Sequence, residues 1–231
     1  MERPPKKWAK RECVFMSAEL QAKIAAYRVP ADLTGLRVPD VGAWDDYWTF
    51  QALHRGAHEV VAIDDFSDRR DTIQKVPRPK WETFDLCRAA LGYSKDRCRR
   101  IEVNVYDVTP ETLGLFDVVF FFGTLYHLRH SLLALDKLSA VCTSRIFVES
   151  AISDDYSPYY GLDEGYAEDM VMEFFPDAQL GQNPTNWWSP TSTCLDSMVR
   201  AAGFQSVAYW KLKGEPTAVP HCRGFVRGVK A

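Results

Sequence analysis

Apolar runs alternate with amphipathic segments along most of this chain, and that rhythm predicts alternating strands and helices. Residues 36–66 show it first. An apolar strand at 38–41 stops at Gly42, a helix begins near Asp46, and a second apolar strand follows at 60–63. Because glycine lets a ligand approach the backbone closely, we expect the turn after the first strand to face a ligand.

The middle of the chain continues the alternation. Residues 101–105 predict a third strand, and residues 116–122 predict a central one. The central run is apolar throughout, as a strand buried on both faces of a parallel sheet requires. Residues 145–149 predict the next strand. The helix expected before it places on its core side Leu132, Leu135, Leu138 and Val141.

Residues 150–188 interrupt this rhythm, because they are rich in Asp, Tyr, Pro and Gly. An irregular insertion of that length in an α/β domain is typical of a lid or a substrate wall. Ser189 is then expected to N-cap a helix that has Pro190 at its first position. Residues 204–210 and 223–229 predict the last strands. Together these elements predict an α/β fold with a doubly wound, mostly parallel sheet and an antiparallel final hairpin.

Composition bounds the class of protein. With 231 residues, 46% of them hydrophobic, the chain can bury one substantial core. We expect a helical lead-in at 1–35 and one domain at 36–231. The net charge of −3 gives no global positive field for nucleic acid, although basic residues gather at 3–11 and 97–100.

The sequence also indicates a compartment. No apolar run reaches the ~18 residues of a membrane span, and the start lacks the apolar region of a signal peptide. Six cysteines are scattered without a CxxC pair, which predicts unpaired thiols in a reducing cytoplasm. His127 and His130 have no neighbouring cysteine or carboxylate cluster, so we expect no metal site.

The turn at Gly42 carries the first candidate chemistry. A dinucleotide site needs a second glycine to leave room for the pyrophosphate, but here the bulky Trp44 follows. Acids around the turn would repel phosphates and attract a cationic sulfonium with an ammonium group, as in S-adenosylmethionine (SAM). Asp64 follows Gly42 at close to the ~20 residues expected for a ribose-binding acid. The plainer alternative is an ordinary β–α–β unit whose helix is N-capped by Asp45 or Asp46.

Three segments, residues 41–66, 116–138 and 183–204, together resemble one group of class I SAM-dependent methyltransferases. That group contains the bacterial enzyme that modifies 5-hydroxyuridine at the tRNA wobble position. The likeness extends from about Leu36 to the C terminus, and the enzyme's long tRNA-binding N-terminal region is not matched. The resemblance implies a Rossmann-like, seven-stranded sheet with SAM as the cofactor and S-adenosylhomocysteine (SAH) as its product.

The resemblance also implies roles for single residues. Asp40 and Gly42 would line the methionine end of SAM, and Asp64 would bind the ribose hydroxyls. Asp107 would face the adenine amino group, with Tyr106 or Val108 on the ring. Relatives commonly carry glycine in place of Asp46. In this chain, Asp46 either caps the helix and attracts the ammonium group of SAM, or it alters the way SAM binds. The expected cofactor-binding residues are Asp40, Gly42, Trp44, Asp64, Asp65, Asp107, Val108, Phe122 and Gly123.

Methyl transfer is a displacement at an activated carbon, so alignment and exclusion of water supply most of the catalysis. A hydroxyl or amine acceptor also needs a base. His127, just past the central strand, is the leading candidate, and its alternative is a capping or packing role. Glu149 is either a second candidate base or a buried acid paired with backbone amides. Tyr126 is expected to orient the acceptor or the sulfonium.

The wobble-uridine enzyme transfers a carboxymethyl group from carboxy-SAM. Tyr126 and Arg223 match positions of that enzyme that could bind the extra carboxylate of carboxy-SAM. The upstream lysine that the enzyme also uses cannot be placed in this sequence, so we favour simple methyl transfer. Aromatic residues of the insertion form either an acceptor wall or core packing. The expected substrate-binding residues are Tyr159, Tyr160, Trp187, Trp188 and Arg223.

Three functions remain open from the sequence. The first is methylation of oxygen or nitrogen on a small-molecule acceptor, favoured by the acidic balance and the aromatic segment. The second is tRNA modification, for which the basic residues at 6–11 and 97–100 would have to supply a binding face. The third is a SAM-binding protein without catalysis, indicated by Asp46. The sequence leaves a homodimer open.

Overall fold

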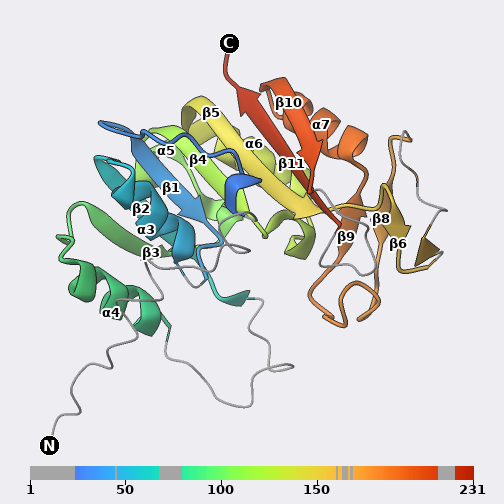
Figure 1. Ribbon diagram of the computed structural model, residues 1–231, viewed down its shortest axis with the longest axis horizontal. Helices are drawn as coiled ribbons and strands as arrows, with labels where there is room; N and C mark the ends of the chain where they lie inside the picture. Colours follow the sequence, from blue (N-terminus) through green and yellow to red (C-terminus); the bar gives the residue numbers. More distant parts are fainter. Residues whose placement is uncertain are drawn as a thin grey trace, which may run out of the picture.

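The computed structural model describes residues 24–44, 46–67, 80–159, 161–162, 166, 169–212 and 222–231, with only the backbone at 161–162 and 206–207. Seven strands form one sheet in the order β10-β11-β5-β4-β1-β2-β3 (Figure 1). β11 runs antiparallel to both β5 and β10, and the other pairs are parallel. The predicted α/β fold is therefore confirmed, with its antiparallel final hairpin. The strands are β1 (Arg37–Val41), β2 (Glu59–Asp64), β3 (Cys98–Glu102), β4 (Phe116–Phe122), β5 (Cys142–Ala151), β10 (Gln205–Lys211) and β11 (Arg223–Val229).

Helices cover both faces of the sheet. The core on one face includes side chains of α5 (Pro110–Leu113), α6 (Ser131–Val141) and α7 (Ser192–Ala201). The core on the other face includes side chains of α3 (Tyr47–His54) and α4 (Glu82–Leu91).

The central strand β4 contributes side chains to both cores. Val119 and Phe121 belong to the core under α6, whereas Val118 and Phe120 belong to the core under α3. All four are at most 1% exposed, which explains why this stretch of sequence shows no polar alternation. Each such side chain contributes roughly 1.5–3 kcal/mol through its burial.

Two short hairpins fall at 150–190, largely within the predicted insertion. β6 (Tyr156–Ser157) pairs with β7 (Gly161–Leu162), and β8 (Met172–Phe174) pairs with β9 (Trp188–Pro190). They lie at the opposite end of the molecule from β3 and α4 (Figure 1).

The third strand was predicted at 101–105, and this placement is wrong by three residues, because β3 spans Cys98–Glu102. Asn104 accepts a hydrogen bond from the backbone N–H of Tyr106 and so starts a 3₁₀ turn, η2 (Val105–Asp107). The arginines of β3 are compatible with a strand because it lies at the edge of the sheet, where charges are common.

Two details of the helices also differ from expectation. Leu132 was predicted on the core side of α6, but its side chain is 49% exposed, and Ala134 is buried on that helix instead. Ser189 was predicted as an N-cap, but it lies in β9, and Thr191 caps α7 by accepting from the Cys194 N–H at 3.1 Å. Leu195, Met198 and Val199 form the buried side of α7.

The lead-in predicted at 1–35 is described only from Ile24 onward, and residues 1–23 lie outside the described part. Tyr27 packs against Trp48, Phe122 and Phe225, with ring centroids 4.4 to 4.9 Å away. This end of the lead-in therefore rests against the core around α3.

Candidate functional site

The strand order reverses at β1, whose neighbours are β2 on one side and β4 on the other. Ligands of open α/β sheets bind outside the carboxyl ends of the strands at such a point. Gly42 follows β1 with φ +74°, and Thr124 follows β4. The Thr124 hydroxyl lies 3.0 Å from the Phe122 carbonyl and 3.3 Å from the Val41 carbonyl, so it bridges the ends of the two strands.

Asp64 ends β2 beside this turn. Its carboxylate accepts hydrogen bonds from the backbone N–H of Trp44 at 3.0 Å and of Phe66 at 2.6 Å. The Trp44 side chain is 53% exposed. The two bonds fix the carboxylate at the mouth of the turn, and carboxylate oxygens are acceptors that suit a ligand's hydroxyl groups.

The acids after β2 and β3 are linked through Asn104. Its amide donates to the Asp65 carboxylate at 2.5 Å while its oxygen accepts from Tyr106 N–H. Asp107, in η2, is exposed, whereas Val108 is fully buried in the core. Tyr106 and Val108 are the two residues expected to pack on the adenine ring, and Tyr106 is the more accessible of them.

Asp40 and Asp46 are both buried, at 3% and 1% exposure. Asp40 accepts a hydrogen bond from the Thr49 hydroxyl at 2.8 Å, which ties β1 to α3. Asp46 occupies the N-cap position of α3 in a left-handed conformation, with φ 65°, and its side chain makes no capping bond. The alternative that its side chain caps the helix is therefore wrong, and Asp45 lies outside the described residues.

Gly123 brings the central strand close to two other candidates. A Cβ at this position would lie 3.6 Å from Glu149 Oε2 and 3.9 Å from the Tyr126 hydroxyl. Phe122, just before it, is buried among aromatic rings, including Tyr27 and Trp48. The backbone at Gly123 thus borders a polar group of side chains.

That group consists of Tyr126, Glu149 and Arg223. Arg223 Nη1 lies 3.3 Å from Glu149 Oε1, and its guanidinium carbon lies 4.9 Å from the centre of the Tyr126 ring. Burial raises the pKa of Glu149, against the opposing pull of Arg223 and of the Gly123 N–H. Burial disfavours the charge on Arg223, but Glu149 and Tyr126 outweigh it and hold the pKa of its guanidinium above the ordinary value. Arg223 is therefore a fixed cation beside a buried acid.

His127 ends the 3₁₀ turn η3 (Leu125–His127), directly after Tyr126. Its Nδ1 lies 3.2 Å from both the carbonyl oxygen and the hydroxyl of Thr185. The ring is half-buried, and its centroid is 4.3 Å from that of Tyr126. This histidine is therefore held by a loop of the predicted insertion rather than by the helix that follows it.

The predicted aromatic wall is divided. The backbone N–H of Trp187 donates to the Tyr126 carbonyl at 2.8 Å, and the Arg129 guanidinium lies 4.0 Å from the centre of the Trp187 ring. Tyr159 is half exposed and donates its hydroxyl hydrogen to the Phe174 carbonyl at 2.8 Å. Tyr160 lies outside the described residues. Trp187 is thus the aromatic residue bound directly to the backbone of η3.

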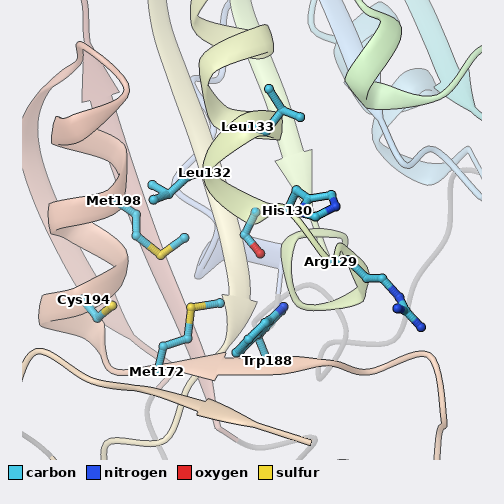
Figure 2. A pocket seen from close by; sticks show the side chains of 9 residues that line it. Arg129, His130, Leu132, Leu133, Met172, Trp188, Cys194 and Met198 are labelled. Carbon is cyan, nitrogen blue, oxygen red and sulfur yellow. The ribbon is translucent and has the colours of Figure 1, made fainter. Parts of the chain in front are cut away.

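Trp188 instead faces a cavity of about 460 Å³ that lies beside α6 and α7 (Figure 2). The side chains of Leu132 of α6 and Met198 of α7 extend toward each other from the two helices, and Leu133 of α6 also belongs to the lining. This hollow is mostly apolar, and its lining includes none of the acids that end β1, β2 and β3. The remaining lining residues are Arg129, His130, Ser131, Met172 and Cys194.

The basic residues at 97–100 are engaged within the protein. Arg99 pairs with Glu59 at 2.8 Å and Arg100 with Asp85 at 2.9 Å. Arg97 donates to the Ala57 carbonyl at 2.9 Å. These side chains stabilise the β2–β3 edge of the sheet.

Within the residues that the structure describes, no group of three or more His, Cys, Asp or Glu residues is arranged for a metal ion. Nor do they contain a helix both long and apolar enough to cross a membrane.

Three residues of the site were missed from the sequence: Thr124, Asn104 and Thr185. Asn104 leaves a usable signal, because Asn at the start of a turn often bonds to the backbone two residues on. Thr124 and Thr185 leave no such signal. Thr124 bonds to the carbonyl of Val41 and Thr185 contacts His127, and both partners are distant in the sequence.

Sequence relatives exist among curated proteins. The chain is 28% identical over 180 residues to the tRNA U34 carboxymethyltransferase of Ectopseudomonas mendocina, covering 76% of this chain and 47% of that protein. It is 26% identical over 179 residues to the enzyme of the same name from Pseudomonas fluorescens Pf-5, covering 76% and 48%. The chain spans about half the length of these relatives. No protein-family model matches it.

Solved structures share the fold at lower identity. The 1,6-didemethyltoxoflavin-N1-methyltransferase of Burkholderia thailandensis, with bound 1,6-didemethyltoxoflavin and SAH, is 19% identical with a TM-score of 0.57, over 98% of this chain and 80% of that one. The magnesium protoporphyrin IX methyltransferase of Synechocystis PCC 6803, with bound SAM, is 13% identical with a TM-score of 0.57, over 100% and 87%. With the strand order described above, these likenesses show that the chain has the fold of the class I SAM-dependent methyltransferases.

Proposed function

We propose that this chain is a SAM-dependent methyltransferase that transfers a methyl group to an oxygen or nitrogen of a small-molecule acceptor. The observation that carries the proposal is the Asp64 carboxylate, held by two backbone N–H groups beside the left-handed Gly42 turn at the switch point of the sheet. A carboxylate at this point suits ribose hydroxyls and a cationic nucleoside, and it disfavours a phosphate.

The residues present fit SAM, which when bound supplies a methyl group already activated by a sulfonium. Asp64 would accept hydrogen bonds from the ribose hydroxyls, and Asp107 would face the adenine amino group. Asp65 is committed to Asn104, and so it would steady the loop that lies beside the ribose. Gly42 and Gly123 would let the cofactor lie close to the ends of β1 and β4.

His127 is our candidate for the group that removes the acceptor's proton, because the turn after β4 holds it near the strand ends. Tyr126 would orient the acceptor. Glu149 would keep Arg223 in place, and Arg223 would bind a polar group of the acceptor. A donor carboxylate, as in carboxy-SAM, would have to compete with Glu149 for Arg223, which supports methyl transfer over carboxymethyl transfer.

Two observations favour a small acceptor. The arginines at 97, 99 and 100, which a phosphate-binding face on this edge would need, already have acidic or carbonyl partners. The methyltransferase of Burkholderia thailandensis, which shares the fold, is described with 1,6-didemethyltoxoflavin and SAH bound.

Calorimetric titration with SAM and SAH tests the cofactor site. Asp64→Asn removes the charged acceptor and should weaken SAM binding about 10- to 100-fold, as expected for a hydrogen bond to a charged group. Asp117→Asn is the matched control, because Asp117 also accepts a backbone N–H, from Arg37 at 2.8 Å, but at the opposite end of the sheet. Equal SAM affinity in the two variants would refute the proposed site.

The curated relatives favour one second candidate, a tRNA-modifying enzyme. Filter binding to unmodified tRNA at about 50 mM and 200 mM salt distinguishes it. A tRNA-binding protein should bind at the lower concentration and lose affinity steeply at the higher one, because phosphate contacts release counterions. Absence of binding at low salt would eliminate this candidate and leave the small-molecule reaction.

A further inference from the structure

A loop of the insertion holds two neighbouring residues of η3. The backbone N–H of Trp187 donates to the Tyr126 carbonyl at 2.8 Å, and His127 Nδ1 lies 3.2 Å from two oxygen atoms of Thr185. Residues about 60 positions away in the sequence therefore decide how the candidate base is oriented.

The chemistry of these contacts determines the tautomer of His127. The Thr185 carbonyl can only accept a hydrogen bond, so Nδ1 must carry the hydrogen. The Thr185 hydroxyl donates its own hydrogen to Asn183 Oδ1 at 2.8 Å, which leaves it an acceptor toward His127 as well. A neutral imidazole that is protonated on Nδ1 carries its lone pair on Nε2.

Asn183 fixes Thr185 in turn. Its side-chain oxygen accepts both the Thr185 hydroxyl and the Thr185 N–H, at 2.8 and 3.0 Å. The loop is anchored beneath by Leu180, which is 2% exposed and packs with Tyr126 and Phe175. The chain of contacts from Asn183 through Thr185 to His127 is therefore built on a packed base.

We propose that Asn183 and Thr185 are positioning residues that hold His127 as its Nδ1–H tautomer, so that Nε2 receives the acceptor's proton. This inference rests on the proposed function. It gives the insertion a second task beside that of a wall, because the contact with Thr185 sets which ring nitrogen of His127 carries the lone pair. Neutral histidine in water prefers the opposite tautomer, so the loop has to impose this one.

Nitrogen-15 NMR of the histidine rings tests the inference without any substrate, with His127→Gln used to assign the signal. Above the titration of the ring, wild-type His127 should show a protonated Nδ1 and an unprotonated Nε2. Asn183→Ala should move the population toward protonated Nε2, whereas Asn183→Asp keeps an acceptor oxygen and should restore the wild-type signature. A wild-type His127 protonated on Nε2, or an Asn183→Ala signature identical to wild type, would overturn the inference.

Kinetics separate this inference from the proposed function. Asn183→Ala should lower kcat about 10- to 100-fold, the range seen when outer-shell partners of metal-binding histidines are lost. Its SAM affinity should stay at the wild-type value, since the side chain of Asn183 bonds to Thr185 and not to Asp40 or Asp64. If the proposed function is wrong, the wild-type protein should not bind SAM. The tautomer of His127 observed by NMR would be unaffected by that result. Unchanged kcat in Asn183→Ala would overturn the catalytic part of the inference.

Discussion

At the scale of single residues, the Gly42 turn depends on one neighbouring side chain. A Cβ at position 42 would lie 2.0 Å from the Thr124 hydroxyl oxygen, so an alanine there meets a steric clash in addition to its unfavourable φ of +74°. Gly92 separates the two effects, because its φ is +75° and nothing lies within 4 Å of its missing Cβ.

Gly92→Ala should therefore cost only the left-handed backbone strain of roughly 1–2 kcal/mol in the free energy of unfolding. Gly42→Ala should cost more, because Thr124 must also move, and adding Thr124→Gly should return the cost toward that of Gly92→Ala. Urea unfolding of the variants measures these differences. Equal costs at Gly42 and Gly92 would show that Thr124 does not constrain the turn.

Glu173 presents a buried acid outside the proposed reaction. It lies in β8 with 9% exposure, and its Oε1 accepts from the Ser157 hydroxyl at 2.5 Å. Burial raises the pKa of this carboxyl above its ordinary value of 4.5, although hydrogen bonds from Ser157 and Ser153 oppose the shift. The folded protein therefore binds this proton more tightly than the unfolded chain does.

Glu173 should consequently make the protein less stable as pH rises from about 4.5 through its raised pKa, because the folded state holds more protons there. Glu173→Gln should flatten that part of the pH dependence, while Glu82→Gln, at an exposed position of α4, should leave it unchanged. Urea unfolding at several values between about pH 4.5 and pH 8 provides the comparison. The expectation fails if the wild type and Glu173→Gln lose stability in parallel.

At the scale of elements, Thr191 connects a helix cap to the insertion. Its hydroxyl accepts from the Cys194 N–H at 3.1 Å and donates to the Asp169 carbonyl at 2.6 Å. Thr191→Ala should lower the free energy of unfolding by about 0.5–2 kcal/mol. Thr191→Ser retains the hydroxyl and should cost less, as judged by thermal or urea unfolding. An equal loss in the alanine and serine variants would assign the effect to the methyl group, which both variants lack.

Elements buried on both faces could be predicted well from the sequence. β4 was predicted at its observed bounds, and β1 and β2 within one residue, because short, mainly apolar runs are typical of strands that are covered on both faces. The edge strand β3 was misplaced, since its arginines are held by ion pairs with residues on other elements. Helix α4 was not predicted.

The candidate site divides in the same way. Asp64 and Gly42 could be found because their spacing reflects one local β–α–β unit. The contacts of His127 with Thr185 and of Arg223 with Glu149 could not, because each joins residues that only the folded sheet brings together. Local pattern identifies which strand ends bear acids, but it contains no information on which distant side chain approaches them.

At the scale of the whole molecule, the proposed cofactor site involves both halves of the sheet. Gly42 and Asp64 belong to the β1–β2 half, and Gly123 to β4, so a ligand that contacts all three links the two halves. A ligand that binds only this assembled arrangement stabilises the folded state by mass action.

SAH at about 100 times its dissociation constant should therefore add ~2.7 kcal/mol, which corresponds to a rise in Tm of roughly 5–10 °C for a chain of this size. Adenosine alone at the same concentration should raise Tm less, because it lacks the methionine end expected near Asp40 and Gly42. Asp64→Asn should lose most of the SAH shift, whereas Asp117→Asn should keep it. Differential scanning calorimetry measures all four cases, and a full SAH shift in Asp64→Asn would place the nucleoside elsewhere on the molecule.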